Sequence, residues 1–372
     1  MKVRYTVPSL VLAAASVGVV FATSRADDAA KQLVPPAPVV PVKLDLPAKN
    51  FTETLPGTEV KFEMVYVPTG EYTMGSPDDE PGRDANEGPR RKVKVKAFWL
   101  GKCEVTWDEY YKFWNDEKLF MAGEVPEDLK KVLGPDAITK PTNTFVDELY
   151  DHGRDGHPAV CMSHHAAMMY CHWLRWKTKK GYRLPTEAEW EFACRAGHDG
   201  PYGFDKAEKL GDYAWYKENS ATKDSTDPNS RRADDGEPTT HKVGTKKANK
   251  LGLHDMHGNV SEWCLDQYDP KFRESLPADK VILGAFNKPT DKKWSHVVRG
   301  GSWADLPTDP VNRLRSASRR VSDRTWMKND PQVPRSIWWL TKLDVVGFRV
   351  CVPVEEYPEL VGLKPMVEKK PD

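Results

Sequence analysis

The chain has 372 residues, of which 39% are hydrophobic, and it carries 55 basic and 55 acidic residues. This length and apolar content allow one large folded domain with a substantial core. The even balance of charge excludes a strongly basic nucleic-acid-binding protein, and we expect no nucleic-acid partner.

The N-terminus has the pattern of an export signal. Lys2 and Arg4 precede an apolar run over residues 10–21, and small residues lie just before Asp27. This order of charged, apolar and cleavage regions predicts that residues 1–26 direct export to the periplasm, the cell surface or the medium. The apolar run is short for a membrane-spanning helix, so we expect membrane attachment only if the segment stays uncleaved.

Residues 27–56 are rich in proline and contain Phe51 as their one aromatic residue. Such a segment lacks the side chains that build a core, so it is predicted to be an extended linker. We expect the folded domain to span residues 57–354 and a solvated tail to occupy residues 355–372.

Two segments near the start of this domain have the alternation typical of half-buried strands. Residues 60–67 alternate apolar and polar side chains, and residues 91–100 alternate basic and apolar ones. Both are predicted to be strands, and residues 70–75 are predicted to form a turn between them.

Three stretches begin with residues typical of helix N-termini. Thr106 is followed three residues later by Glu109, which is the capping-box pattern, and Ser163 is a second residue of the N-cap type. Pro185 stands at the start of a third apolar and acidic stretch. The predicted helices span residues 107–114, 164–177 and 185–197.

Between residues 197 and 252 turn-forming and polar residues dominate, with isolated aromatic residues among them. This composition predicts long loops anchored by aromatic side chains. The chain has no internal repeat of fixed period, which disfavours propellers and solenoids.

Six ordered motifs connect these elements to a known family. They are MVYVPTGEYTMGS (64–76), FWLGKCEVTWDEYYKFW (98–114), YRLPTEAEWEFACRAG (182–197), GLHDMHGNVSEW (252–263), VRGGSW (298–303) and VGFRV (346–350). In this order they resemble the formylglycine-generating enzyme or sulfatase-modifying factor family. The resemblance implies a single mixed α/β (α+β) domain of C-type-lectin-like topology, rich in loops, with short antiparallel strands and few helices.

The region of the family's active site departs from the family pattern. Active members oxidise a cysteine of a sulfatase with a copper-binding cysteine pair that follows the GGS turn, and the two positions fall here on Asp305 and Pro310. Neither side chain offers the soft thiolate that copper(I) needs, so copper is not expected. Ser302 keeps the position of a family serine, whereas Ser261 replaces a tryptophan that helps active members hold substrate.

These losses favour an exported, non-catalytic binding or assembly module built on the family's scaffold. One alternative is an oxidoreductase of the same superfamily that acts on a protein or small thiol through metal ligands other than cysteine. Another is a chiefly structural envelope protein that the proline-rich linker tethers. The sequence leaves these alternatives open.

The segment DMHGNVSE has the composition of a calcium loop, because two hard oxygen ligands flank a glycine. The resemblance implies a structural calcium ion bound by the side chains of Asp255 and Glu262 and by the carbonyl groups of Gly258 and Val260. The alternative is a turn that Asp255 and Asn259 hold through hydrogen bonds to nearby amides.

Histidines and cysteines gather in HPAVCMSHHAAMMYCHW at residues 157–173. The segment lacks the tight ligand spacing of zinc motifs, so packing is favoured over a soft-metal site. Export permits disulfide bonds, but the spacing of the six cysteines selects no pairing. The resemblance suggests that Cys171 faces the C-terminal strand around Cys351. It also places the usual partner of Cys194 at Ser316, so that second bridge is expected to be absent.

Arginines and tryptophans are concentrated after the GGS turn. Arginine matches carboxylate, sulfate and phosphate oxygens, and indole rings stack on sugars. We therefore hypothesise a cleft that binds an acidic peptide or an anionic polysaccharide. The alternative is that the arginines pair with acidic residues and the tryptophans fill the core. The expected cleft residues are Ser261, Ser302, Trp303, Arg313, Arg315 and Arg319.

Overall fold

The computed structural model describes residues 46–116, 152–221, 236–290, 294–327, 336–340, 343–361 and 363. All of them lie within one compact unit that spans Val40–Asp372. The predicted export signal lies outside the described residues. None of the helices in the described part of the chain has the length and apolar character of a membrane span.

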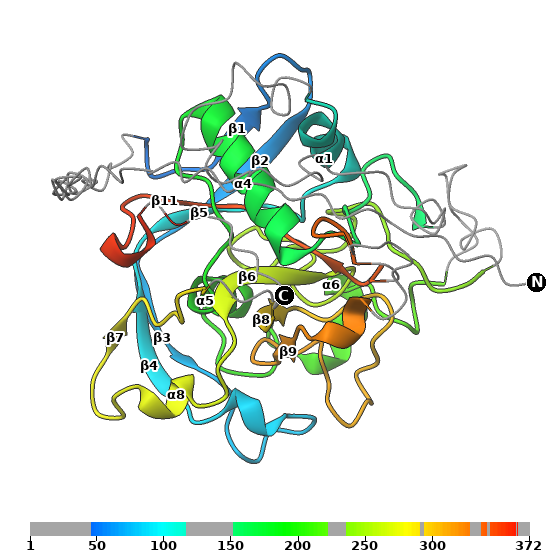
Figure 1. Cartoon of the computed structure of the whole chain (residues 1–372). Coiled ribbons are helices and arrows are strands. Elements are labelled where there is room, and N and C mark those ends of the chain that lie inside the picture. The colour runs from blue at the N-terminus through cyan, green and yellow to red at the C-terminus, as the bar shows by residue number, and fades with distance from the viewer. Residues whose placement is uncertain are drawn as a thin grey trace, which may run out of the picture. The chain divides into compact units, whose positions relative to one another are not determined.

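Three small sheets organise the described part of the chain, which confirms the expected mixed α/β fold (Figure 1). The first sheet, β1-β2-β5-β11, is antiparallel and consists of Phe51–Thr54, Lys61–Val67, Phe98–Gly101 and Cys351–Pro353. The second, β10-β6-β8-β9, consists of Val346–Gly347, Ser261–Gln267, His296–Arg299 and Arg320–Val321, with β10 parallel to β6. The third, β3-β4-β7, consists of Gly70–Met74, Arg91–Val95 and Ile282–Leu283, with β7 parallel to β4.

The helices of the described residues are short, and their caps explain where the longer ones start. Thr106 and Glu109 form the predicted capping box at α1, and the hydroxyl of Ser163 accepts a hydrogen bond from the amide of Ala166 at α4. Thr186 caps α5 in the same way. The α-helices are α1 (Trp107–Trp114), α4 (His164–Thr178), α5 (Glu187–Arg195), α6 (Leu210–Tyr213) and α8 (Phe272–Ser275). The 3-10 helices are η1 (Ala85–Glu87), η3 (Ala207–Lys209), η4 (Arg324–Met327) and η5 (Pro358–Leu360).

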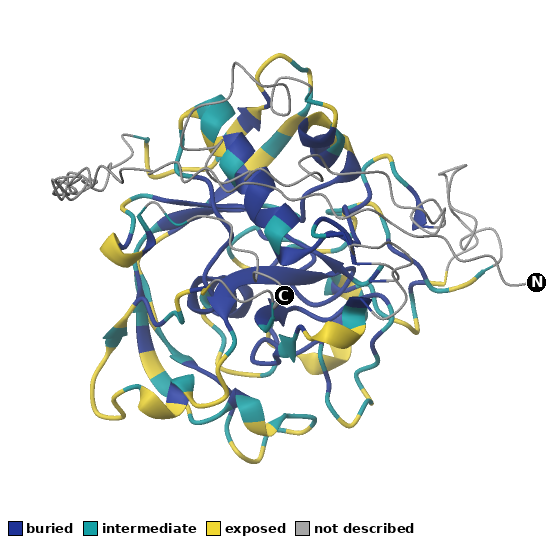
Figure 2. Ribbon diagram, in the orientation of Figure 1, coloured by how far each residue is buried: buried dark blue, intermediate teal, exposed yellow. Residues whose placement is uncertain are grey.

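The first sheet has a buried core on each of its faces, because alternate side chains of a strand point in opposite directions. Trp99 and Val352 pack into the core that contains the apolar residues of α1 and α4. Phe98 and Leu100 pack into a second core, which contains Trp190 of α5 and the apolar residues of β3 and β4. The buried ribbon in the middle of the described unit reflects these two cores (Figure 2).

The structure corrects several predicted boundaries. Residues 51–54, which we assigned to the linker, form β1 and pair with β2, so the folded part begins before residue 57. Residues 70–75 contain β3 rather than only a turn. The single strand predicted over residues 91–100 is two strands that belong to different sheets. Tyr357, in the predicted solvated tail, is buried and accepts a hydrogen bond from the amide of Lys96.

Candidate functional site

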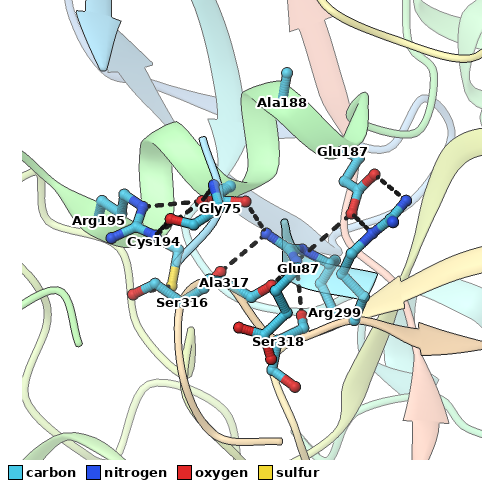
Figure 3. Close-up of polar contacts among 12 residues, drawn as sticks. Gly75, Glu87, Glu187, Ala188, Cys194, Arg195, Arg299, Ser316, Ala317 and Ser318 are labelled. Atoms are coloured by element: carbon cyan, nitrogen blue, oxygen red, sulfur yellow. Dashed lines mark hydrogen bonds and ion pairs between the residues drawn. The ribbon is translucent and has the colours of Figure 1, made fainter. Parts of the chain in front are cut away.

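A buried ionic network around α5 holds the loop that follows the GGS turn (Figure 3). Arg299, at the end of β8, pairs with Glu191 of α5 and donates hydrogen bonds to the carbonyl groups of residues 316–318 at 2.7–2.9 Å. Glu191 also pairs with Arg195 at 2.9 Å. Burial raises the pKa of Glu191, but Arg299, Arg195 and Arg273 outweigh it and lower this pKa to about 2. The network therefore fixes an ionised carboxylate beside the loop.

The GGS turn needs glycine because it passes close to the same loop. Gly301 has a φ of +68°, and a Cβ atom there would lie 2.8 Å from Leu314 and 2.9 Å from the carbonyl oxygen of Arg313. Ser302 directly follows this tightly packed turn. It therefore stands at the start of the segment in which the family pattern has its cysteine pair.

Asp305 is tied into this segment by both of its carboxylate oxygens. Its Oδ2 atom accepts hydrogen bonds from the amide and the hydroxyl group of Ser302, at 2.9 and 2.7 Å. Its Oδ1 atom lies 3.3 Å from Nη1 of Arg313. The carboxylate therefore closes the loop that begins at the GGS turn.

A tight turn separates the two positions of the expected cysteine pair. The amide of Asp309 donates to the carbonyl group of Leu306 at 3.2 Å, and the amide of Leu306 donates to Oδ2 of Asp309 at 3.0 Å. Asp305 and Pro310 therefore lie on either side of a closed turn.

The indole ring of Trp303 packs against His152, which belongs to none of the sequence motifs. The ring centroids of His152 and Trp303 are 5.2 Å apart, and Nε2 of His152 lies 2.9 Å from Oδ2 of Asp344. Nδ1 of His152 lies 2.9 Å from the hydroxyl of Thr239. These partners are far apart in sequence and belong to no motif, so sequence reasoning missed them.

Arg320 of β9 is a second residue that the expected cleft did not include. Its guanidinium group lies 4.9 Å from the ring centroid of Trp326, and it makes no ion pair within the part of the chain that the structure describes. Burial lowers its pKa, and the positive charge of Arg313 adds to this effect while Asp305 opposes it. Arg320 is therefore a half-buried cation that stacks on an aromatic ring and forms no ion pair among the described residues.

Arg315 and Arg319 do not face a groove. Arg315 is buried and pairs with Glu80 and Glu87, and Arg319 is buried and pairs with Glu187. For these two arginines the structure supports the alternative of internal ion pairing. Ser261, in β6, is also buried.

The two carboxylates of the expected calcium loop differ in how many of their oxygen atoms accept hydrogen bonds. Glu262 accepts hydrogen bonds from Nε and Nη2 of Arg349, each at 2.6 Å, and from the indole of Trp190 at 2.8 Å. Oδ2 of Asp255 accepts from the amide of Gly244 at 2.7 Å, whereas its buried Oδ1 has no partner. The carboxylate of Glu262 therefore serves an ion pair, while that of Asp255 keeps one free oxygen.

The other two residues of this loop are fixed by close packing. A Cβ atom at Gly258 would lie 2.2 Å from the carbonyl oxygen of Trp215, and Val260 is fully buried. Oδ1 of Asn259 accepts a hydrogen bond from the amide of His241 at 2.9 Å. Asp255 and Asn259 therefore bond to amides of another segment, 11 and 18 residues away in sequence, and these are not the local bonds of the alternative turn.

The histidine-rich segment makes internal contacts. Nε2 of His164 lies 3.0 Å from the carbonyl oxygen of Cys264, and its ring stacks on that of His296 at 3.6 Å. Burial and His296 lower the pKa of His164 well below its usual value. Within the described ranges, no group of three or more histidine, cysteine, aspartate or glutamate residues is arranged to hold a metal ion.

All six cysteines lie in the described residues, and no disulfide bond joins any two of them. Cys171 packs in the same core as Val350 and Val352, whereas Cys351 points into the core on the other face of the sheet. Ser316 lies beside Cys194, as the resemblance implies.

Comparisons with known proteins agree with this fold. Residues 52–330 match the family model described as the sulfatase-modifying factor enzyme 1-like domain. The chain is 30% identical to the mouse formylglycine-generating enzyme over 228 residues, which is 55% of this chain and 58% of the mouse protein. It is also 30% identical to the bovine inactive C-alpha-formylglycine-generating enzyme 2 over 314 residues, 77% of this chain and 86% of that protein. Among solved structures, PvdO from Pseudomonas aeruginosa is similar, with a TM-score of 0.52 and 28% identity over 78% of this chain and 94% of that chain.

Proposed function

We propose that this chain, which belongs to the sulfatase-modifying factor family, is a binding or assembly module and not a copper-dependent cysteine oxidase. The observation that carries the proposal is the arrangement of Asp305. Its carboxylate is committed to Ser302 and Arg313, at the position where the family pattern has a copper-binding cysteine. Pro310, at the other end of the turn, has no donor atom in its side chain.

The names of the similar proteins include both an active enzyme and an inactive relative. The chain matches both a mouse protein named as a formylglycine-generating enzyme and a bovine protein named as inactive. It spans only 58% of the mouse protein's length. The chemistry of the residues at the turn therefore carries more weight than either name.

Incubation with copper and a sulfatase-type cysteine peptide tests the loss of oxidase activity. A family member with both cysteines serves as the positive control, and mass spectrometry detects the aldehyde product. We expect no conversion above the rate of copper alone. Conversion at catalytic rates would overturn the proposal, and conversion with another added metal would favour the alternative of an oxidoreductase with non-cysteine ligands.

The binding surface that we propose lies beside the GGS loop. Arg320 on the face of Trp326 is a cation without a carboxylate partner among the described side chains, and the side chain of Arg313 is 42% exposed. Two guanidinium groups near an aromatic ring suit an anionic partner, either an acidic peptide or an anionic polysaccharide. Ser302 and Trp303 are buried, so they are not part of the exposed surface that we propose.

Retention on immobilised sulfated polysaccharide and on polyglutamate, measured against salt, tests this surface. Arg313→Ala and Arg320→Ala are expected to lower retention on one of the two matrices by about tenfold or more. Lys94→Ala is the matched control, because Lys94 is an exposed cation in β4, a strand of the third sheet. An equal loss in the control would show that only bulk charge matters and would contradict the proposal.

Export is part of the same proposal and rests on the pattern of residues 1–26. Cell fractionation together with N-terminal sequencing of the mature protein tests it. Recovery of the intact N-terminus in the cytoplasm would contradict it, and an intact N-terminus in the membrane fraction would indicate an uncleaved anchor.

A further inference from the structure

A pocket of about 580 Å³ is lined by three segments of the chain, namely the residues after β3, the residues around η1, and α8. This volume falls within the range of pockets that hold small molecules. Most of the side chains with functional groups that line it are charged. The lining residues are Ser76, Pro77, Asp78, Arg83, Ala85, Gly88, Pro89, Arg90 and Glu274.

One side of the pocket belongs to a buried polar network. Ser76 is 1% exposed, and its hydroxyl group donates to Oε2 of Glu87 at 2.7 Å and accepts from Nε of Arg83 at 3.3 Å. Glu87 is fully buried and pairs with Arg315. Ser76 and Arg83 are therefore fixed before a ligand arrives, which lowers the entropy that binding costs.

Two further contacts hold the guanidinium group of Arg83 at the pocket. Its Nη1 atom lies 3.0 Å from Oδ1 of Asp78, and a Cβ atom at Gly88 would lie 2.8 Å from its Nη2 atom. The side chain of Arg83 is 18% exposed. Because Arg83 lines the pocket, part of its positive charge is accessible to a ligand there.

Two opposite charges line the same pocket without pairing. Arg90 and Glu274 are both exposed, and neither forms an ion pair with another residue that the structure describes. Glu274 belongs to α8, and Arg273 of the same helix donates a hydrogen bond to the carbonyl group of Glu87 beside η1. The two charges thus stand on anchored segments, and a ligand with one negative and one positive group can bind between them.

We propose that this pocket binds a small zwitterion that carries a carboxylate and an ammonium group, as free amino acids and short peptides do. The guanidinium groups of Arg83 and Arg90 match the carboxylate, and the carboxylate of Glu274 matches the ammonium group. Pro77 and Pro89 offer apolar contact to the rest of the ligand. A simple anion would meet the repulsion of Glu274, so the mixed charge favours a zwitterion over phosphate or sulfate.

Isothermal titration calorimetry of the purified full-length chain with L-alanine and with L-alanyl-L-alanine tests the proposal, and it distinguishes an amino-acid site from a peptide site. Two modified dipeptides each lack one charged end, because N-acetylation removes the ammonium group and amidation removes the carboxylate. We expect at least one of the two unmodified ligands to bind. Each modification is expected to weaken binding by about tenfold or more.

Variants at the two exposed charges assign the ends of the ligand. In Arg90→Ala, amidation is expected to weaken binding less than it does in the wild type, because one partner of the carboxylate is already gone. In Glu274→Gln, N-acetylation is expected to weaken binding less, for the same reason. Lys92→Ala and Glu71→Gln are matched controls, since both residues are exposed, lie in β4 and β3, and do not line the pocket. These controls should bind as the wild type does.

Three results would overturn the proposal. The first is a wild-type chain that binds neither L-alanine nor the dipeptide in the millimolar range. The second is binding of acetate or sulfate as tight as that of the dipeptide, which would indicate a site for simple anions. The third is an equal loss of affinity in the control variants, which would show that only bulk charge matters. None of these results bears on the surface beside the GGS loop, because Arg313 and Arg320 do not line this pocket.

Discussion

The hydroxyl oxygen of Ser316 lies 3.6 Å from the sulfur of Cys194, in a buried contact between α5 and the loop after the GGS turn. The family resemblance places the usual disulfide partner of Cys194 at Ser316, and the structure confirms that the two side chains touch. The fold has thus kept the geometry of a crosslink whose second sulfur is missing.

Ser316→Cys is therefore expected to form a disulfide with Cys194. Burial raises the pKa of the Cys194 thiol to about 12, so little thiolate exists at neutral pH and the bridge should form slowly without a disulfide-exchange catalyst. Once formed, it should stabilise the fold by about 2–4 kcal/mol. Thiol titration after unfolding and urea denaturation measure the two effects. Ser316→Ala, which adds no thiol, is the control, and seven titratable thiols in the oxidised Ser316→Cys variant would contradict the prediction.

Arg299→Met is expected to destabilise the domain by about 3–5 kcal/mol, because it leaves the buried carboxylate of Glu191 without its closest partner. The folded-state pKa of Glu191 is about 2, below its ordinary value of 4.5. Its stabilising contribution is thus complete above pH 4.5 and is lost as the pH falls toward 2. Urea denaturation at several pH values should show a smaller loss over this window in the variant than in the wild type. If the free energy of unfolding falls equally with pH in the variant and the wild type, other carboxylates dominate acid unfolding.

The helices were predictable from sequence because their caps are local signals. Thr106 with Glu109, and Ser163 before α4, need only neighbouring residues to act. The split of residues 91–100 was not predictable, because it depends on which sheet each half joins. β1 was missed because its four residues, FTET, lie in a proline-rich segment and are held as a strand by pairing with β2.

The candidate site was predictable only in part. The GGS turn and Asp305 follow from the motifs, whereas the roles of Arg315 and Arg319 depend on partners more than a hundred residues away in sequence. The equal numbers of basic and acidic residues in the chain are compatible with arginines that line a solvated groove or that pair internally, and only the fold decides between these two arrangements. The contact of His152 with Asp344 is hidden from sequence for the same reason.

His257→Gln is expected to reduce the loss of stability in mild acid. His257 is buried and neutral, with Nδ1 beside the carbonyl group of Leu314 at 2.8 Å and Nε2 accepting from the amide of Gly203 at 3.0 Å. Burial lowers its pKa to about 4 from 6.5.

Below pH 6.5 the unfolded chain binds a proton that the folded chain does not, so stability falls between pH 6.5 and 4 by about 3 kcal/mol. Glutamine keeps a donor and an acceptor without titrating, and denaturation curves across this window should show a shallower slope. An unchanged slope would assign the effect to other histidines.

The double variant Asp305→Cys with Pro310→Cys is expected to gain a copper(I) site. These two positions flank the closed turn between Leu306 and Asp309, so two thiolates placed there should reach one ion. Titration with copper(I) in competition with a coloured chelator measures the affinity. The double variant should bind at least about tenfold more tightly than either single variant, because the second thiolate binds an ion that the first already holds nearby.

Equal affinities in the single and double variants would show that the turn no longer has the geometry of a cysteine pair, and that the scaffold around Asp305 has changed along with the ligands. If the double variant binds copper(I) more tightly but forms no aldehyde, the remaining cause of inactivity lies in substrate binding, where Ser261 replaces the family's tryptophan.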